Sequence, residues 1–327
     1  MVFQNIDFHN VAELQPCEKG YGMLRVPDRV RLQLSEPARE RASRFASGVE
    51  LRFKIKSETA TVILRADPNE EAQTACIYYG AFQGGWKTST KTIGLEETRI
   101  TIPKPEHLDT LQKITEEQQL GFQPDVVRLL LPYGTCYFVG VEGDVEPPKP
   151  ADLPRKTYLA YGSSITHGSL ALVTPATYTF RLARRLKCDY CNLGFAGSAH
   201  MEKGMAEYLV SRKDWDFATV EMGINMMGDE FPVALFEERV RDFVAVLARD
   251  PRPVFATDMF GFVTGNTQKA DQYRQIVRRY ASEKLIFTDG LSLLGNPAHL
   301  SQDLTHPAWE GMEEIAANWY PVIRQHI

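Results

Sequence analysis

At 327 residues the chain is longer than most single hydrophobic cores, which predicts two domains. Its formal net charge of −5, without a local cluster of Lys and Arg, argues against nucleic acid as a partner. The N-terminus lacks the pattern of a secretory signal, and no stretch approaches the roughly eighteen apolar residues that span a bilayer. We therefore expect a cytoplasmic protein without a membrane partner.

The first part of the chain contains short runs in which apolar and polar residues alternate. In "VELRFKIKS", for example, Val49, Leu51 and Phe53 fall on one face of a strand. Similar runs cover residues 59–66, 75–82, 98–105, 126–132 and 135–143. The more polar segment 106–122 predicts a short helix inside a long connection. Several short strands at this spacing predict an all-β sandwich or jelly roll over residues 1–145.

The pattern changes after residues 146–156, where four prolines predict a semi-rigid linker. From residue 157 to 327, strand-like and helix-like segments alternate. Strands are expected at residues 157–162, 190–195, 217–223, 253–260 and 285–290, and helices at 178–187, 202–213, 233–250, 270–283 and 309–325. This alternation predicts an α/β domain in which helices cover both faces of a parallel five-stranded sheet, a flavodoxin-like three-layer arrangement.

Polar groups follow the first three strands of this expected sheet. "YGSSITHGS" places Ser164 at a helix start, "NLGFAGSAH" places Gly197 in a turn, and "VEMGINMMG" places Asn225 in another. Taken one at a time, these are an ordinary helix cap, a tight turn and a turn-forming Asn. Because functional groups gather at the carboxyl ends of parallel strands, the three together indicate a serine nucleophile with donors for an oxyanion.

A serine nucleophile needs a base, and "DLTHP" supplies a candidate after the last strand. A loop there can return His306 to Ser164, with Asp303 holding the imidazole. The alternative is an ordinary helix start, capped by Asp303 and with Pro307 in its first turn.

The motifs "GSSIT", "GFAGSA", "GIN" and "DLTH", in this order, resemble the four sequence blocks of the SGNH hydrolases, also called the GDSL esterase/lipase superfamily. The resemblance covers residues from about 157 to 327. One position departs from it, because the family's Gly-Asp-Ser reads Gly-Ser-Ser here, with Ser163 in place of Asp. That Asp is not a member of the triad, and the spacing to the Ile-Thr pair favours Ser164 over Ser163 as the nucleophile.

The resemblance implies a role for each matching residue. Ser164 is the expected nucleophile and its own N–H an oxyanion donor, Gly197 and Asn225 are the other two donors, His306 is the general base, and Asp303 orients it. A β-sandwich before such a domain is similar to the arrangement of two-domain carbohydrate esterases and of some acyltransferases.

Four further residues are candidate walls of a substrate pocket, although capping, solvent-facing or core positions are equally open to them: His167, His200, Met226 and Trp309. No His, Cys and carboxylate set has zinc-ligand spacing, so neither a metal nor a cofactor is expected. The five scattered cysteines favour reduced, mostly buried thiols, including Cys188 and Cys191 of the C-x-x-C pair.

The sequence thus predicts a serine esterase for small acyl esters, with acetyl groups on a small molecule or oligosaccharide as the expected substrate. An acyltransferase that uses the same acyl-enzyme is the first alternative. The second alternative is a carbohydrate-binding protein with a silent second domain. No pattern in the sequence indicates the oligomeric state.

Overall fold

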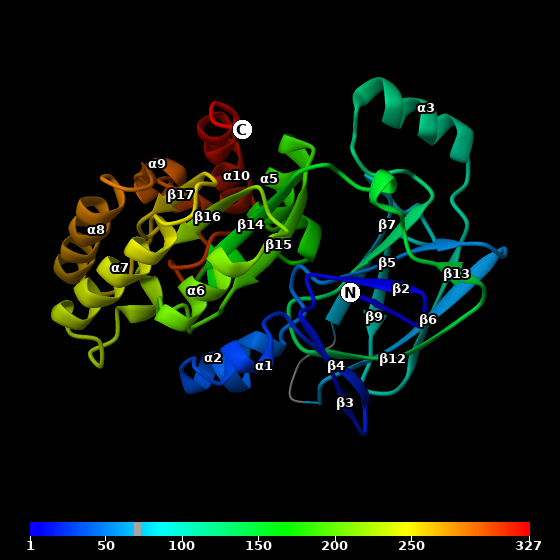
Figure 1. Cartoon of the computed structure of the whole chain (residues 1–327), viewed down its shortest axis with the longest axis horizontal. Coiled ribbons are helices and arrows are strands. Elements are labelled where there is room, and N and C mark those ends of the chain that lie inside the picture. The colour runs from blue at the N-terminus through cyan, green and yellow to red at the C-terminus, as the bar shows by residue number, and fades with distance from the viewer. Residues whose placement is uncertain (69–72) are drawn as a thin grey trace.

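A computed structural model of the chain describes residues 1–68 and 73–327, and Figure 1 shows a β-rich N-terminal half beside a C-terminal half rich in helices. The N-terminal half contains two antiparallel sheets. The first sheet, in spatial order, contains β1 (Val2–Phe3), β2 (Ile6–His9), β5 (Glu50–Ile55), β11 (Val126–Leu130), β7 (Gln73–Tyr79) and β8 (Phe82–Gln83), with β13 (Val145–Glu146) beside β5 and β9 (Thr90–Ile93) beside β7. The second contains β10 (Thr98–Pro103), β6 (Thr59–Ala66), β12 (Cys136–Glu142), β4 (Gly20–Leu24) and β3 (Glu13–Cys17).

The two sheets pack face to face around an apolar core, which confirms the expected antiparallel architecture. Leu51 and Phe53 of β5, both fully buried, share this core with Val62 of β6 and Phe138 of β12. The expected strands from residue 49 to residue 143 are all present. The short strands β1 to β4, β8 and β9 were not expected, because runs of two to five residues carry too little alternation to be recognised.

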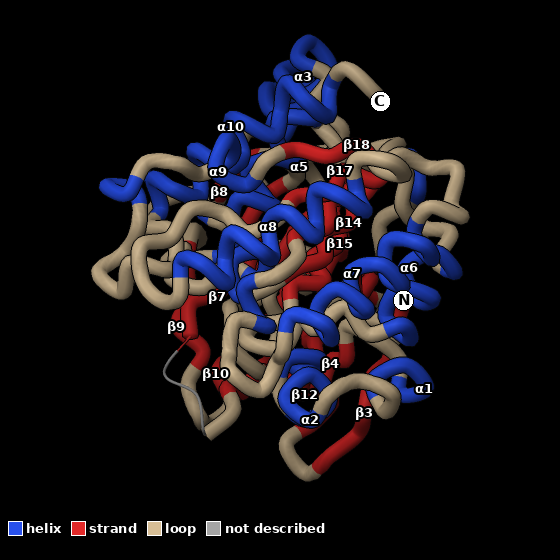
Figure 2. Tube along the Cα trace, turned by 90° about the vertical axis from the view of Figure 1, so that its left-hand side faces the viewer, coloured by secondary structure: helices blue, strands red, loops and turns tan. Residues whose placement is uncertain are grey.

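The C-terminal half contains a parallel sheet in the order β15 (Asp189–Gly194), β14 (Thr157–Gly162), β16 (Phe217–Glu221), β17 (Val254–Thr257), β18 (Ile286–Thr288). The helices are α4 (Ser164–His167), α5 (Tyr178–Leu186), α6 (Lys203–Ser211), α7 (Val233–Leu247), α8 (Thr267–Ala281), α9 (Gly290–Leu293) and α10 (Trp309–Arg324). Alternate residues of β14 enter different cores: Leu159 and Tyr161 pack with α6, α7 and α8, whereas Tyr158 and Ala160 pack with α5 and α10. Figure 2 shows α7 and α8 side by side along the sheet. The predicted three-layer α/β fold is therefore confirmed.

Residues between β4 and β5 form short helices that the alternation of the sequence did not indicate: α1 (Asp28–Arg31), α2 (Glu36–Glu40) and the 3₁₀ turn η1 (Ala42–Arg44). They extend from the β half toward α6 (Figure 1). Val30, Leu34 and Phe45 of this segment are buried in the core of the α/β half. A segment that belongs to the first half in sequence thus completes the hydrophobic core of the second.

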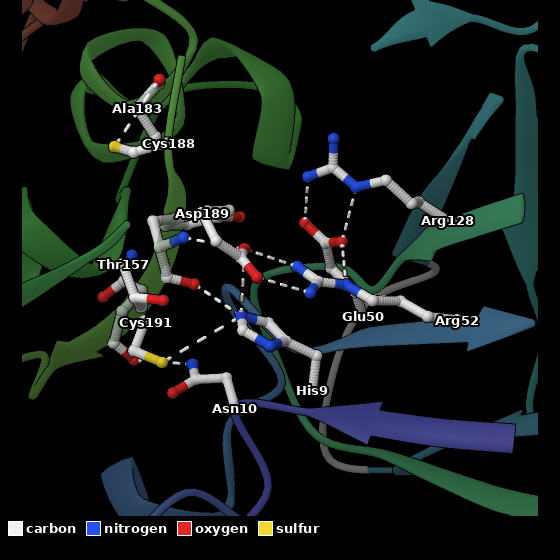
Figure 3. A network of polar contacts seen from close by, with 12 residues as sticks. His9, Asn10, Glu50, Arg52, Arg128, Thr157, Ala183, Cys188, Asp189 and Cys191 are labelled. Carbon is white, nitrogen blue, oxygen red and sulfur yellow. Dashed lines mark hydrogen bonds and ion pairs between the residues drawn. The ribbon is translucent and has the colours of Figure 1, made fainter. Parts of the chain in front are cut away.

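The outer face of the first β sheet is also buried, and it carries charges (Figure 3). Both Nη atoms of Arg52 donate to the carboxylate of Asp189 on β15, at 2.6 and 2.7 Å. Arg52 and Arg128 also donate to Glu50, at 2.8 Å from each Nε. Glu50 and Arg52 are fully buried. The polar residues of β5 therefore face the α/β half, and the sheet is covered on both sides.

The division of the chain into residues 1–145, a linker and residues 157–327 stays a prediction. In the fold, β13 still pairs with β5 through Val145 and Glu146, and β14 begins at Thr157. Between them a 3₁₀ turn, η2 (Pro150–Asp152), replaces part of the expected linker. α3 (Leu108–Gln118) is the short helix expected in the long connection. All five cysteines are free thiols, and all except Cys17 are buried. Within the described ranges no helix is long and apolar enough to cross a bilayer.

Candidate active site

The turn between β14 and α4 places Ser164 at the first position of a helix. Gly162, the last residue of β14, has no room for a side chain, because a Cβ there would lie 2.6 Å from the carboxylate of Glu221 and would also collide with Thr166. Ser163 caps the helix by accepting the N–H of Ile165 at 3.1 Å. The close packing of this turn fixes the direction of the Ser164 side chain.

Ser164, His306 and Asp303 form a continuous hydrogen-bonded chain. The Oγ of Ser164 lies 2.8 Å from Nε2 of His306, and Nδ1 of His306 lies 2.6 Å from Oδ2 of Asp303. The loop before α10 brings the last two residues back to the end of β14, as the sequence predicted for a returning loop. This is the arrangement in which imidazole can take the hydroxyl proton of a serine.

Asp303 is held in its ionised form by its own loop. Partial burial would raise the pKa of this carboxyl, but it accepts the N–H groups of His306 and Thr305 and the hydroxyl of Ser301, at 2.7 to 2.9 Å. These hydrogen bonds and the one from the imidazole hold the pKa of Asp303 well below its usual range. The carboxylate therefore both starts the loop and orients His306, so the two interpretations of "DLTHP" are compatible.

Ser163 is directed away from the imidazole. It is buried, and its hydroxyl and N–H both donate to Oε2 of Glu221, at 2.8 and 2.9 Å. The hydroxyl of Thr166 donates to the same oxygen at 2.9 Å. Burial raises the pKa of Glu221, and these three donors oppose the rise. Sequence reasoning missed Glu221, although a carboxylate inside the buried strand "FATVE" was a visible signal.

The backbone N–H groups of Ser164 and Gly197 and the side-chain amide of Asn225 line one cavity and could donate hydrogen bonds to an oxyanion. Gly197 adopts φ of +68°, and no acceptor within the described structure bonds to its N–H or to that of Ser164. Asn225, in the 3₁₀ turn η4 (Ile224–Met226), accepts the N–H of Ala199 through Oδ1 at 3.1 Å. That bond fixes the amide so that its Nδ2 group is left as a donor. The structure thus brings together the five residues that the sequence singled out.

Two cavities meet at His306. The first, of about 520 Å³, is lined by Ser164, Gly197, Asn225 and His306, and is called the catalytic cavity below. The second, of about 580 Å³, lies between the two halves of the chain, is lined by Asp303 and His306 among others, and is called the interdomain cavity. His306, Tyr133 and Ser169 line both of them, with the Ser169 hydroxyl donating to that of Tyr133 at 2.8 Å.

The N-terminal half contributes to both cavities, which the sequence did not indicate. Arg41 and Tyr133 line the catalytic cavity. The interdomain cavity is lined from the same half by Ser47, Gln73, Thr74, Pro132 and Tyr133. These residues carry no motif, because their position depends on how the β half packs against the α/β half.

His167 and His200, expected as walls of a substrate pocket, are not among the described residues that line the catalytic or the interdomain cavity. His167 is fully buried, with its ring nitrogens 2.9 and 3.0 Å from the carbonyl oxygens of Gly194 and Tyr133. Burial and the neighbouring Arg25 lower the pKa of His167 to about 3, so the ring is neutral. The ring of His200 packs on Phe231 with centroids 4.8 Å apart. Both histidines thus have packing roles.

Met226 and Trp309 also lie away from the cavities. Met226 is fully buried in the core beneath η4. Trp309 is half exposed at the start of α10, where the guanidinium of Arg181 lies 5.3 Å from its ring. The apolar walls of the catalytic cavity are instead Ile224, Met227 and Phe262. Met226 and Met227 are adjacent in the sequence, and sequence alone does not tell which of them faces the cavity.

Comparison with known proteins agrees with this arrangement. The chain is similar in structure to a salicylyl-acyltransferase from a tetracycline biosynthetic pathway, at 16% identity and a TM-score of 0.75, over 98% of this chain and 94% of that one. It is also similar to a family two carbohydrate esterase from Clostridium thermocellum in complex with cellohexaose, at 14% identity and a TM-score of 0.60, over 85% and 91% of the two chains. A third similar structure is an acetyl xylan esterase from the rumen bacterium Butyrivibrio proteoclasticus, at 12% identity and a TM-score of 0.59, over 99% and 96%.

At these identities the three structures support the fold, and no curated protein matches the chain in sequence. Residues 160–314, a segment that contains Ser164, Gly197, Asn225 and His306, match the model of the GDSL-like lipase/acylhydrolase family. The α/β half therefore contains a domain similar to that family, which supports an ester-hydrolysing enzyme.

Proposed function

We propose that the protein is a serine esterase that removes small acyl groups, acetyl above all, from a carbohydrate. The observation that carries this proposal is the chain from Ser164 through His306 to Asp303, which opens into a cavity lined by Gly197 and Asn225. Each member of such a chain has a distinct task, and each task requires the geometry described above.

In the first half of the reaction, Oγ of Ser164 attacks the ester carbonyl carbon while Nε2 of His306 takes the hydroxyl proton. Asp303 stabilises the imidazolium that forms. The carbonyl oxygen becomes an oxyanion, which accepts hydrogen bonds from the N–H groups of Ser164 and Gly197 and from the amide of Asn225. The carbon–oxygen bond to the alcohol then breaks, and His306 gives its proton to the leaving oxygen.

In the second half, water attacks the acyl-serine carbonyl and gives a proton to His306. The same three donors hold the second oxyanion, and its collapse releases the carboxylic acid and returns the proton to Ser164. The residues need no further group for either step.

The size of the catalytic cavity and two of the similar proteins support the choice of substrate. A space of about 520 Å³ lined by Ile224, Met227 and Phe262 suits a short acyl group with part of its alcohol. One similar structure was solved with cellohexaose, and another is an acetyl xylan esterase.

Turnover of 4-nitrophenyl acetate tests the nucleophile. Ser164→Ala should lower kcat by a factor on the order of 10³ or more, and His306→Ala should do the same, because removing either group ends proton transfer to and from the ester. Ser163→Ala, which removes the adjacent hydroxyl, is the control. It should retain turnover, because Ser164 is still present to attack the ester. Undiminished turnover by Ser164→Ala would overturn the assignment.

Acyl transfer to a second alcohol is the alternative function. The interdomain cavity meets the catalytic cavity at His306, which gives an acceptor alcohol a place from which His306 could take its proton. The similarity to a salicylyl-acyltransferase points the same way. Product analysis with an excess of xylose or glucose separates the two functions, since transfer yields an acetylated sugar at the expense of free acetate.

A further inference from the structure

The catalytic cavity has an uneven distribution of charge. Its lining includes the guanidinium of Arg41 and the imidazole of His306, and in the described structure no Asp or Glu lines it. Arg41 comes from the segment between β4 and β5, immediately after α2. A permanent cation therefore lies at the wall of a cavity that also contains Ser164 and the oxyanion donors.

Three other arginines of that segment have polar side-chain partners, and Arg41 differs from these three. Arg31 pairs with Asp28, Arg39 pairs with Glu40, and Arg44 donates to Gln15. No described residue forms an ion pair or hydrogen bond with the side chain of Arg41. The N–H donors of Arg41 are therefore open to a ligand.

Aromatic packing supports the position of this guanidinium. It lies 5.4 Å from the centre of the Phe45 ring, and Phe45 in turn lies 5.5 Å from Tyr133, another residue of the cavity wall. Stacking on a ring leaves the N–H edge of a guanidinium free to donate. One face of the Arg41 guanidinium thus packs against an aromatic ring, and the N–H donors at its edge remain open.

A second guanidinium, that of Arg25, lies beside the end of α4 but does not line the catalytic cavity. Arg25 is buried, and its donors reach the carbonyl oxygens of Asn192 and Ala42, so no described carboxylate neutralises it. It also approaches Nδ1 of His167 at 3.4 Å, and His167 ends the helix that Ser164 begins. The lining of the catalytic cavity itself thus carries the positive charge of Arg41, whereas Asp303 lies behind His306 and lines the interdomain cavity instead.

We propose that Arg41 binds a carboxylate on the alcohol part of the ester, so that the preferred substrate is the acetyl ester of an acidic alcohol, such as an acidic sugar. The inference rests on the proposed esterase function. A carboxylate fits because a guanidinium presents two parallel N–H donors to it. The alcohol part must carry the charge, since an acetyl group has no room for one.

Two aryl acetates of matched shape test this: 4-acetoxybenzoate, which is anionic, and 4-acetoxybenzamide, which is neutral. The quantity to compare is the ratio of their kcat/KM values, measured by release of the phenol. Arg41→Gln should lower this ratio about fivefold to tenfold, as expected for a charge-assisted contact that is partly screened by solvent. Arg41→Lys should retain part of the preference, and higher salt should reduce it in the wild type.

Arg39→Gln is the matched control, because Arg39 lies on α2 two residues before Arg41, carries the same charge and pairs with Glu40 outside the cavity. It should leave the ratio at the wild-type value. An equal ratio in the wild type and in Arg41→Gln would overturn the inference. That outcome, with turnover still dependent on Ser164, would leave the esterase proposal standing, whereas turnover independent of Ser164 would overturn the esterase proposal itself.

Discussion

The carboxylate of Glu221 lies beneath the turn that carries the nucleophile and bonds to Ser163, the residue before it. The resemblance to the SGNH hydrolases implies an Asp next to the nucleophile, and this chain carries Ser163 there. Oε2 of Glu221 accepts three hydrogen bonds, two from Ser163 and one from Thr166, while no described residue bonds to its buried Oε1. A carboxylate at the end of β16, the neighbouring strand, thus accepts the hydrogen bonds of the turn that contains Ser163.

Substitution of Glu221 should therefore affect both stability and rate. Glu221→Ala leaves three buried donors without an acceptor and should lower the free energy of unfolding by about 3–5 kcal/mol, with a large loss of kcat as the turn relaxes. Glu221→Gln keeps an oxygen for the same donors and should recover most of both losses. Urea denaturation and steady-state kinetics measure the two effects.

Glu207→Gln is a suitable control, because Glu207 is exposed and pairs only with Lys203 on its own helix. If Glu221→Ala unfolded at the wild-type urea concentration, the three hydrogen bonds would have no structural importance.

At the scale of elements, the turns that follow the strands place the site, and glycine makes one of them possible. Gly223 adopts φ of +130° just before η4, which carries Asn225. A Cβ at this position would lie 2.8 Å from Cγ of Met259. Both the backbone conformation and the packing exclude a side chain here.

Gly223→Ala should consequently lower the free energy of unfolding by about 2–4 kcal/mol and reduce kcat by moving Asn225. Gly265→Ala separates the two causes, because Gly265 has φ of +94° but no atom within 4 Å of its missing Cβ. It should cost about 1–2 kcal/mol, from backbone strain alone. Thermal unfolding of both variants tests this, and equal stabilities would mean that Met259 moves aside freely.

The longer strands, the long helices and the candidate site of Ser164 with four further residues could be predicted because each depends on a local pattern. The β5 run shows alternation, and "GSSIT" and "DLTH" keep fixed spacings. The short helices α1 and α2 could not, since their few apolar residues are buried by the other half of the chain. Arg41 and Tyr133 could not be predicted either, because only the packing of the two halves brings them to the catalytic cavity.

At the scale of the whole molecule, a buried network of charges joins the two halves (Figure 3). His9 of β2 takes part in it, with Nε2 at 2.6 Å from the carbonyl oxygen of Tyr190 and 3.5 Å from Asp189. Burial and Arg52 oppose protonation of this ring, but Asp189 and Cys191 outweigh them and raise its pKa to about 9. The protonated form is therefore favoured in the folded protein.

This raised pKa gives a dependence of stability on pH with a definite sign. The stabilisation from protonated His9 is fully present below its ordinary pKa of 6.5 and is lost as the pH rises through about 9. His9→Gln keeps a donor for the carbonyl oxygen of Tyr190 but cannot be charged. The wild type should exceed it in free energy of unfolding by about 1–3 kcal/mol at pH 6, and by less at pH 10.

Urea denaturation across this range measures the difference. His107→Gln, at an exposed position at the start of α3, should show no comparable change with pH. A constant difference between the wild type and His9→Gln from pH 6 to pH 10 would contradict the prediction.

The first β sheet, covered on both faces, has a consequence for any attempt to take the enzyme apart. Separating the two halves within residues 146–156 would expose Asp189 to solvent, together with the core that Val30, Leu34 and Phe45 complete. It would also leave Arg52 without the carboxylate that it binds. We therefore expect that the proline-rich stretch joins two folding patterns without separating two independently stable domains. The catalytic half expressed alone should therefore be insoluble, and grafting it onto another N-terminal domain should fail unless the residues from β4 to β5 travel with it.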